Sequence, residues 1–310
     1  MQGVILLFGP TAVGKTALLK SFFTKGFEVI SADALQVYKE LNIGTAKPDK
    51  EILSLIPHHL INIKSYKEPF NVGEFCKLAD TAVKEIHSRG RIPVISGGTA
   101  FYFKTWLTGM PETPPADSKV REKAEKQWGS LSCEQLREEL AKHDSISAER
   151  IGKNDRYRLL RALEVWLQSG RPLSSFSAGK EIRNDYKIFS AGLNRPRAVL
   201  YERINKRVDL MFAEGLKSEV ENLRLSGAQK NDPGMKGIGY KEWFAEEGMP
   251  EPDEETVKEL IKRNTRRYAK RQITFFSSIP GVKWFEFREE NDIPEGLAET
   301  IADWVDQVKK

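Results

Sequence analysis

A glycine-rich loop near the start of the chain constrains the fold more than any other feature. The segment Gly9–Thr16 reads Gly-Pro-Thr-Ala-Val-Gly-Lys-Thr and fits the pattern G-x-x-x-x-G-K-[ST]. An apolar run, Val4–Phe8, precedes it, and a helical pattern begins at Thr16. A strand, a glycine loop and a helix in this order predict a phosphate-binding P-loop. The alternative, a glycine-rich turn without a ligand, does not explain this context.

The P-loop predicts an anion site. Glycines let backbone N–H groups turn inward, and the helix N-terminus adds a partial positive charge. Lys15 is expected to reach phosphate oxygens and Thr16 to hold Mg²⁺. We expect the whole loop to bind the phosphate compound: Gly9, Pro10, Thr11, Ala12, Val13, Gly14, Lys15 and Thr16. The loop alone does not identify that compound or the reaction.

The first 110 residues alternate between strand and helix patterns. This alternation predicts an α/β fold, a P-loop NTPase-like parallel sheet flanked by helices. Ligands then bind at the carboxyl ends of the strands. The strands are expected at Val4–Phe8, Phe27–Ser31, His59–Ile63 and Ile92–Ser96, and the helices at Thr16–Thr24, Val72–Arg89 and Ala100–Leu107.

A change of pattern marks an insertion. Three prolines fall within Pro111–Pro115, and the sequence from Lys119 to Ser169 is charged and helix-periodic. Asn154-Asp155 predicts a helix start there, and Gly170-Arg171-Pro172 predicts its end. We therefore expect an all-helical insertion domain at 114–183, between a first part of the core at 1–113 and a return to the core at 184–310. A strand is expected at Tyr186–Leu193, and helices from Ala198 onward.

Composition is typical of a globular protein, with 40% hydrophobic and 30% charged residues in 310. No apolar stretch is long enough to cross a bilayer. Cys76 and Cys133 are isolated, with no C-x-x-C spacing, which indicates a reducing compartment and neither disulfide nor zinc chemistry. The start of the chain runs straight into the first strand, so we expect no signal peptide and a cytoplasmic protein.

The modest net charge of +5 has one concentrated source. Six of the ten residues in Lys262–Arg271 are basic and none is acidic. Arg263, Arg267 and Arg271 fall four apart, on one face of a helix. With Tyr268 among them, this surface suits a polyanion. Charge alone leaves open a solvated helix balanced by acids elsewhere.

Two further candidate residues follow strands. Asp33 ends the second strand and could bind Mg²⁺ through water or accept a proton. Thr99 follows Gly97-Gly98 after the fourth strand and adds a hydroxyl. For each, a simple N-cap is the alternative. Gln36 could read the edge of an adenine through its amide.

Several segments limit the class of protein. The fourth strand ends without a Walker-B carboxylate, and the chain lacks Asn-Lys-x-Asp, so a nucleotide switch is disfavoured. His58-His59 lacks partners at metal-ligand spacing and is interpreted as structural or near the substrate. Arg158 and Arg161 lie on the polar side of a predicted helix, where a phosphate contact is reasonable.

Together these motifs resemble the tRNA dimethylallyltransferase (tRNA isopentenyltransferase) family. The matching segments run in family order over nearly the whole chain. They are Gly9–Thr16, Ser31–Asp33, Gln36–Tyr38, Ile43–Pro48, Pro57–Leu60, Gly97–Thr99, Asn154–Arg156, Arg161–Val165, Ile238–Glu242 and Thr265–Gln272.

The resemblance implies a reaction. A dimethylallyl group passes from dimethylallyl diphosphate to N6 of adenosine 37, next to the anticodon on its 3′ side, in tRNAs that read codons starting with U. The P-loop would hold the diphosphate with Mg²⁺, and ATP would not be needed. Asp33 matches the family's base, and Thr99 matches the residue that positions the amine. The implied partners are a tRNA anticodon stem-loop and the donor, bound by a monomer.

The resemblance also implies a set of tRNA contacts. They are Asp33, Ala34, Leu35, Gln36, Thr99, Arg121, Tyr157, Arg158, Leu159, Leu160 and Arg161. We add Arg263 and Arg267 from the basic helix. Many members have Ser and a basic residue where this chain has Ala34 and Leu35, and His-Pro where it has Gly152-Lys153.

Two alternatives from other classes remain. A P-loop kinase of small metabolites would use Asp33 to activate a hydroxyl, but it does not explain the basic segment Lys262–Arg271. A non-catalytic RNA-binding protein would use the P-loop only as a phosphate clamp, and it does not explain why Asp33 and Thr99 converge on that loop.

Overall fold

The chain forms two units, each with its own core. The computed structural model describes residues 2–110, 112–176, 182–245, 248–288 and 293–309. The first unit combines Met1–Trp106 with Asn184–Lys310, and the second is Leu107–Arg183. The insertion expected at 114–183 falls within the second unit, and Pro111, the first of the prolines before it, and residues 177–181 lie outside the described residues.

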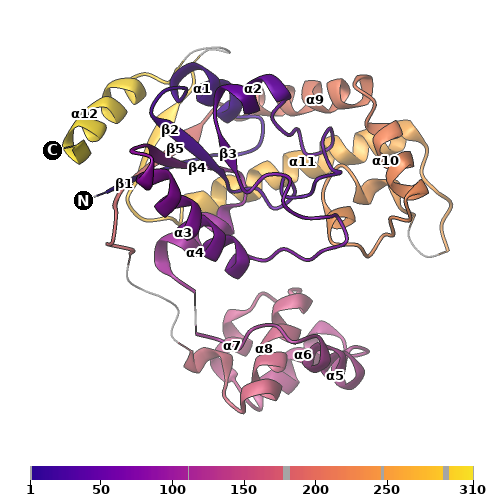
Figure 1. Ribbon diagram of the computed structural model, residues 1–310. Coiled ribbons are helices and arrows are strands. Elements are labelled where there is room, and N and C mark those ends of the chain that lie inside the picture. The colour runs from indigo at the N-terminus through magenta and orange to yellow at the C-terminus, as the bar shows by residue number, and fades with distance from the viewer. Residues whose placement is uncertain (1, 111, 177–181, 246–247, 289–292, 310) are drawn as a thin grey trace. The chain divides into compact units, whose positions relative to one another are not determined.

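The first unit is built on one sheet whose pairings are all parallel, which confirms the predicted fold class. The strand order is β3-β2-β4-β1-β5-β6 (Figure 1). The strands are β1 (Gly3–Phe8), β2 (Phe27–Ser31), β3 (His58–His59), β4 (Ile92–Gly97), β5 (Lys187–Asn194) and β6 (Val282–Glu286). β1 is buried throughout, because helices cover both faces of the sheet.

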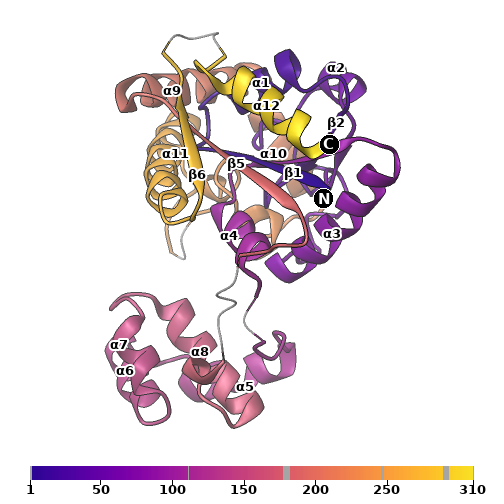
Figure 2. The same ribbon diagram turned by 90° about the vertical axis from the view of Figure 1, so that its left-hand side faces the viewer.

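Helices cover both faces of this sheet (Figure 2). On one face, Leu18 and Leu200 pack against Ile5 in a common core with Ile301. On the other face, the Phe8 ring lies 5.0 Å from Phe103 and 4.7 Å from Phe276. The first face carries α1 (Lys15–Phe22), α9 (Arg197–Ala213) and α12 (Leu297–Lys309), and the second carries α3 (Val72–Ser88), α4 (Ala100–Thr108) and α11 (Glu254–Phe276).

A second cluster extends this unit beside the sheet. The loop after β2 packs on α10 (Leu216–Leu225) through Tyr38 and Leu41, with Tyr240 fully buried between them. The remaining short elements are α2 (Lys50–Leu55), η2 (Gly234–Lys236) and η3 (Lys241–Trp243).

Two expectations about strands were wrong. The strand expected at His59–Ile63 is only β3, because Leu60 and Asn62 adopt left-handed backbone conformations, with φ of 61° and 57°. The chain is also not wholly helical after Ala198, since β6 adds an edge strand. Only Phe285 of β6 is buried, so its apolar periodicity is too weak to detect from the sequence.

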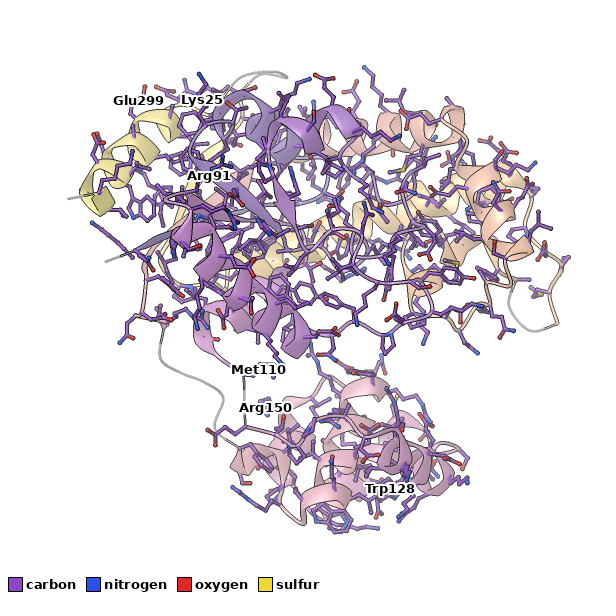
Figure 3. All side chains as sticks on the ribbon, viewed as in Figure 1. Lys25, Arg91, Met110, Trp128, Arg150 and Glu299 are labelled. Carbon is purple, nitrogen blue, oxygen red and sulfur yellow. The ribbon has the colours of Figure 1, made fainter. Side chains whose placement is uncertain are left out.

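The second unit is helical, with no strand among its described residues. Its core gathers Trp128, Leu136 and Leu163, and Figure 3 shows the labelled Trp128 within it. Its helices are α5 (Ser118–Trp128), α6 (Cys133–Ala141), α7 (Ser145–Arg150), α8 (Arg156–Ser169) and the short η1 (Leu173–Ser175). The predicted ends of α8 are confirmed, because Asp155 caps it and Gly170 ends it with a φ of 68°.

Candidate active site

The P-loop lies between β1 and α1 at the carboxyl edge of the sheet. Its tight turn requires a φ of 122° at Gly14, where a Cβ atom would also lie 3.1 Å from the ring of Phe287. Lys15 Nζ folds back and donates to the carbonyls of Gly9 and Pro10, at 2.9 and 3.0 Å. The ammonium group is therefore held directly over the loop.

Two arginines of α9, far from the P-loop in the sequence, hydrogen-bond to it. Arg203 Nε donates to the Ala12 carbonyl at 3.0 Å, and Arg207 Nη1 donates to Thr11 Oγ1 at 3.2 Å. Both arginines line a cavity of about 500 Å³ together with the loop. Neither arginine is predicted from the sequence, although their spacing of four places them on one face of α9.

The basic helix α11 closes the same cavity. Gln272 Oε1 accepts the Thr11 N–H at 2.9 Å, and its Nε2 donates to the Gly98 carbonyl at 2.6 Å. The Tyr268 hydroxyl donates to that carbonyl as well, at 3.2 Å. One face of α11 therefore ties the P-loop to the turn after β4.

Asp33 follows β2 and Thr99 follows β4, and the Thr99 side chain contacts the backbone next to Asp33. Asp33 Oδ1 accepts the N–H groups of Leu35 at 2.9 Å and Gln36 at 3.3 Å, so this oxygen caps a turn. Thr99 Oγ1 accepts the Ala34 N–H at 3.0 Å. Among the described residues, no hydrogen bond or ion pair engages Asp33 Oδ2. Asp33 can therefore cap the turn through Oδ1 and act as a base through Oδ2.

Glycine permits this close approach of the two strand ends. A Cβ atom at Gly97 would lie 2.2 Å from the Ala32 carbonyl oxygen, well inside van der Waals contact. The Thr99 N–H then donates to the same carbonyl at 3.1 Å. The Gly97-Gly98-Thr99 motif therefore fixes the distance between the two candidate catalytic residues.

Positive charge dominates the P-loop cavity. Burial, and then the nearby Arg207, lower the pKa of Lys15 to about 7, against the opposing effect of Asp33. Burial also lowers the pKa of Arg207 itself. Lys15, Arg203, Lys206 and Arg207 outnumber the one carboxylate, Asp33, in this cavity, which favours binding of a negatively charged ligand.

A second cavity, of about 550 Å³, adjoins the first. Thr11, Asp33, Thr45, Arg207 and Tyr268 line both. Its other walls are mainly apolar and include Leu35, Phe70, Val208, Met211, Ile238 and Ile261. Asp33 therefore lies where a basic cavity and an apolar cavity meet. Burial and the charge of Asp33 raise the pKa of Tyr268 to about 12, so its hydroxyl stays protonated.

The amide of Gln36 is used within its own loop. Its Oε1 accepts from the Ser31 hydroxyl at 3.2 Å, and its Nε2 donates to the Thr45 carbonyl at 3.4 Å. These contacts hold the loop between the two cavities. Base recognition through this amide stays a prediction.

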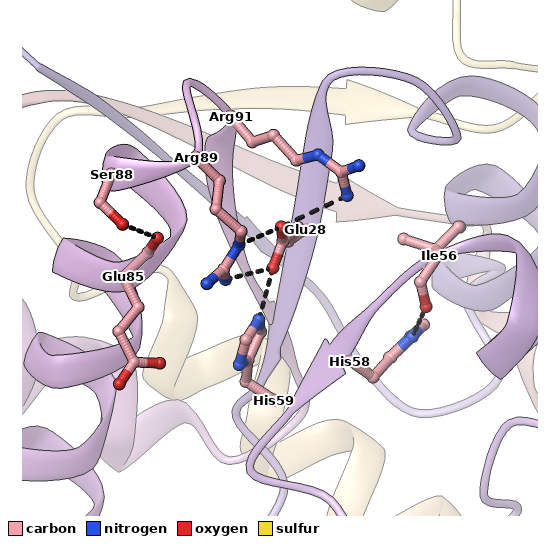
Figure 4. Close-up of polar contacts among 8 residues, drawn as sticks. All are labelled: Glu28, Ile56, His58, His59, Glu85, Ser88, Arg89 and Arg91. Atoms are coloured by element: carbon pink, nitrogen blue, oxygen red, sulfur yellow. Dashed lines mark hydrogen bonds and ion pairs between the residues drawn. The ribbon is translucent and has the colours of Figure 1, made fainter.

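The two adjacent histidines point to opposite faces of the sheet (Figure 4). His59 Nε2 lies 2.7 Å from Glu28 Oε2, beside Arg89 and Arg91. His58 lines the P-loop cavity, and its Nδ1 lies 2.7 Å from the Ile56 carbonyl. Burial lowers the pKa of His58, which favours the neutral imidazole.

The predicted tRNA contacts of the helical unit divide into exposed and buried residues. Tyr157 is 65% exposed, with the Arg121 guanidinium 5.7 Å from its ring centre, and Arg158 is exposed beside it. Arg161 is held by Glu164 at 3.1 Å and by the Pro114 carbonyl. The side chains of Leu159 and Leu160 are buried in the unit's core.

The basic residues of α11 divide in the same way. Lys262 pairs with Asp209 at 2.9 Å, and Arg266 donates to Asn205 Oδ1 at 2.5 Å. Arg263 and Arg267 are exposed, as are Lys270 and Arg271. The free positive surface is therefore narrower than the sequence alone predicts.

A P-loop beside an unpaired carboxylate, at the junction of two cavities, defines an enzyme that transfers a group from a phosphorylated donor. The sequence model of the IPP transferase family matches residues 36–279, and that of isopentenyl transferase matches residues 2–69. The chain belongs to this family of tRNA dimethylallyltransferases. No helix in the described part of the chain is long and apolar enough to span a membrane.

Three of the relatives match over nearly their whole length. The tRNA dimethylallyltransferase of Geobacter sulfurreducens is 40% identical over 92% of each chain, and that of Borreliella afzelii is 39% identical over 93% of this chain and 96% of its own. The structure of the tRNA isopentenylpyrophosphate transferase of Bacillus halodurans matches with a TM-score of 0.68, 34% identity, and 99% and 97% coverage. A eukaryotic dimethylallyltransferase acting on tRNA matches with a TM-score of 0.72 and 25% identity, over 92% of this chain and 74% of its own.

Proposed function

We propose that this enzyme transfers a dimethylallyl group from dimethylallyl diphosphate to N6 of adenosine 37 in tRNAs that read codons beginning with U. The observation that carries the proposal is Asp33 at the junction of a cationic and an apolar cavity. The acceptor follows from the family, whose relatives are named for action on tRNA.

The donor's diphosphate binds in the P-loop cavity. The N–H groups of Gly14, Lys15 and Thr16, the Lys15 ammonium and the Arg207 guanidinium surround it. These donors stabilise the negative charge that grows on the diphosphate as it leaves. The loop is fixed beforehand by α9 and α11, so little reorganisation is needed during the reaction.

The adenine leaves its stack and enters the apolar cavity, because its N6 is otherwise out of reach. The N6 lone pair attacks C1 of the dimethylallyl group, and the C1–O bond breaks with its electron pair on the diphosphate. Asp33 Oδ2 takes the proton that N6 releases. The Thr99 hydroxyl, held by the Ala34 N–H, positions the amine.

The cavity also fits Mg²⁺. Mg²⁺ binds through few protein ligands and through substrate phosphates, so it needs no cluster of carboxylates. Within the described residues, no group of three or more His, Cys, Asp and Glu could hold a metal. Thr16 would supply the protein ligand, with diphosphate oxygens and water. When bound, Mg²⁺ offsets charge on the leaving diphosphate.

The tRNA is held by charges outside the two cavities. In α11, Arg263 and Arg267 are the exposed candidates for phosphate contacts, and Tyr157 and Arg158 are those of the helical unit. Such contacts position the RNA and do not read its sequence. A small-metabolite kinase is not favoured, because it has no use for this surface.

Nucleoside analysis tests the proposal directly. Unmodified tRNA, dimethylallyl diphosphate, Mg²⁺ and the purified protein should yield N6-dimethylallyladenosine without ATP. The same tRNA with adenosine 37 replaced by guanosine should yield none. Product that appears only with ATP, or phosphate transferred to a small acceptor, would support the kinase instead.

A further inference from the structure

One buried nitrogen of the P-loop cavity lacks a partner. His58 Nδ1 lies 2.7 Å from the Ile56 carbonyl, and a carbonyl can only accept, so Nδ1 carries the proton. In the neutral ring, Nε2 is then a hydrogen-bond acceptor. Nε2 is buried and has no hydrogen-bond partner among the described residues. A buried polar atom of this kind calls for an explanation, since leaving it unpaired costs free energy.

The adjacent histidine, His59, has a hydrogen-bond partner for its Nε2. His59 Nε2 has Glu28 at 2.7 Å on the opposite face of the sheet. His58 instead shares its cavity with Thr16, the candidate metal ligand, and with the hydroxyl residues Ser31 and Ser96. The partner missing from His58 is therefore expected to come with the ligand.

The chemistry of P-loop sites indicates which kind of group would donate to His58 Nε2. In P-loop NTPases an Asp at a strand end helps to hold the Mg²⁺ and its water. In this chain the corresponding strand, β4, ends in Ser96-Gly97. A hydroxyl offers a weaker acceptor than a carboxylate for the polarised hydrogens of metal-bound water. The unpaired Nε2 belongs to His58, which lines the same cavity.

We propose that His58 Nε2 accepts a hydrogen bond from a water molecule on the Mg²⁺ that accompanies the diphosphate. His58 is then a positioning residue for the hydrated metal and does not touch the reacting atoms. A water molecule takes about 30 Å³, so the cavity of about 500 Å³ has room for a diphosphate and a partly hydrated Mg²⁺. The inference rests on the diphosphate site proposed above.

The test measures metal binding and needs no turnover. Inorganic diphosphate is titrated into the full chain by calorimetry over a range of Mg²⁺ concentrations. His58→Leu removes the acceptor, whereas His58→Gln keeps a carbonyl oxygen near the position of Nε2. We expect His58→Leu to raise the Mg²⁺ concentration that half-saturates diphosphate binding by about tenfold or more, as loss of an outer-shell partner does elsewhere. His58→Gln should restore most of the difference.

His59→Leu is the matched control, because it changes the adjacent ring on the opposite face and leaves the cavity intact. It should lower the melting temperature without changing the Mg²⁺ dependence. If folded His58→Leu shows the Mg²⁺ dependence of the wild type, the inference is overturned. It is also overturned if the variant loses as much affinity for diphosphate at saturating Mg²⁺ as at low Mg²⁺. If His58→Leu does not fold, His58→Met against His58→Gln makes the same comparison. Failure of the wild type to bind diphosphate at any Mg²⁺ concentration would instead contradict the proposed function.

Discussion

Glu28 lies within β2 and Asp33 follows its end, yet the two carboxylates have opposite surroundings. Glu28 is buried and receives two hydrogen bonds from Arg89, at 2.9 and 2.7 Å, with Arg91 and His59 also in contact. Asp33 influences Lys15 and Arg207 by its charge, but among the described residues no cation forms an ion pair with it.

This difference separates groups that stabilise the fold from groups that await a ligand. A buried charge that is fully paired is part of the structure, and removal of one partner leaves the others uncompensated. In the P-loop cavity, by contrast, the charged groups have like-charged or more distant neighbours, which raises the free energy of the empty site. Binding of a charged ligand recovers that free energy. Substitutions at the two positions should therefore affect different measurements.

Asp33→Asn should give the largest effect. It keeps an Oδ1 acceptor for the turn but removes the proton acceptor, so kcat should fall by about 10²–10⁴-fold, the range for a positioned general base. Affinity for dimethylallyl diphosphate and the melting temperature should change little. The measurement is single-turnover transfer to tRNA. Near-normal turnover would reduce Asp33 to a turn cap and remove the contrast with Glu28.

Glu28→Gln should do the reverse. It leaves Arg89, Arg91 and His59 without their anion, so the free energy of unfolding at pH 7 should fall by on the order of 3 kcal/mol. Turnover per folded molecule should be unchanged. Arg89 holds the pKa of Glu28 at about 2, below its usual 4.5. The stabilisation is thus complete above pH 4.5 and is lost as the pH falls toward 2, where urea curves of variant and wild type should converge.

The same contrast applies to the basic helix. Arg263 and Arg267 are exposed, whereas Lys262 pairs with Asp209. Replacing both arginines with Ala should weaken binding of cognate and non-cognate tRNA alike. It should also lower the slope of log affinity against log salt by roughly one unit for each lost phosphate contact. Donor affinity should not change.

Lys262→Ala is the control for that pair, because it should cost stability and leave the salt slope close to wild type. An unchanged slope in the double arginine variant, together with a lower melting temperature, would make these arginines structural. The RNA path would then be sought along Arg158 and Arg161.

Lys15 should give the smallest signal, a change in bound protons. Its pKa of about 7 leaves it mostly neutral at pH 8, and a bound diphosphate should raise that pKa again. Calorimetry at pH 8 in buffers of different ionisation enthalpy should show that the wild type takes up more protons than Lys15→Met, by up to about one. Equal uptake would mean that Lys15 is already charged in the free cavity.

Local patterns predicted much of this molecule. The P-loop, Asp33 and Gly97-Gly98-Thr99 each follow a buried strand, and parallel topology alone brings their strand ends to one edge. The start and end of α8 followed from Asp155 and Gly170, which act within one turn of the backbone.

The rest depended on contacts between distant segments. Arg203 and Arg207 meet the P-loop only because α9 crosses it, and nothing near them in the sequence signals this. Leu60 rarely adopts a positive φ, so the early end of β3 could not be foreseen. Lys262 and Arg266 contact Asp209 and Asn205 of α9, so the position of α9 determines which basic residues of α11 stay exposed.

The order in which the site is completed has a consequence for synthesis. The P-loop is made early, but Gln272 and Phe287, which contact Thr11 and Gly14, are made late. At about 5–20 residues per second, a ribosome needs tens of seconds to cover that interval. During this interval α11 is not yet packed against the P-loop, and β6 is not yet paired with β5. A nascent chain therefore reaches a donor-binding shape only after Gln272 and Phe287 have been made, and holding factors have a defined period in which to act on it.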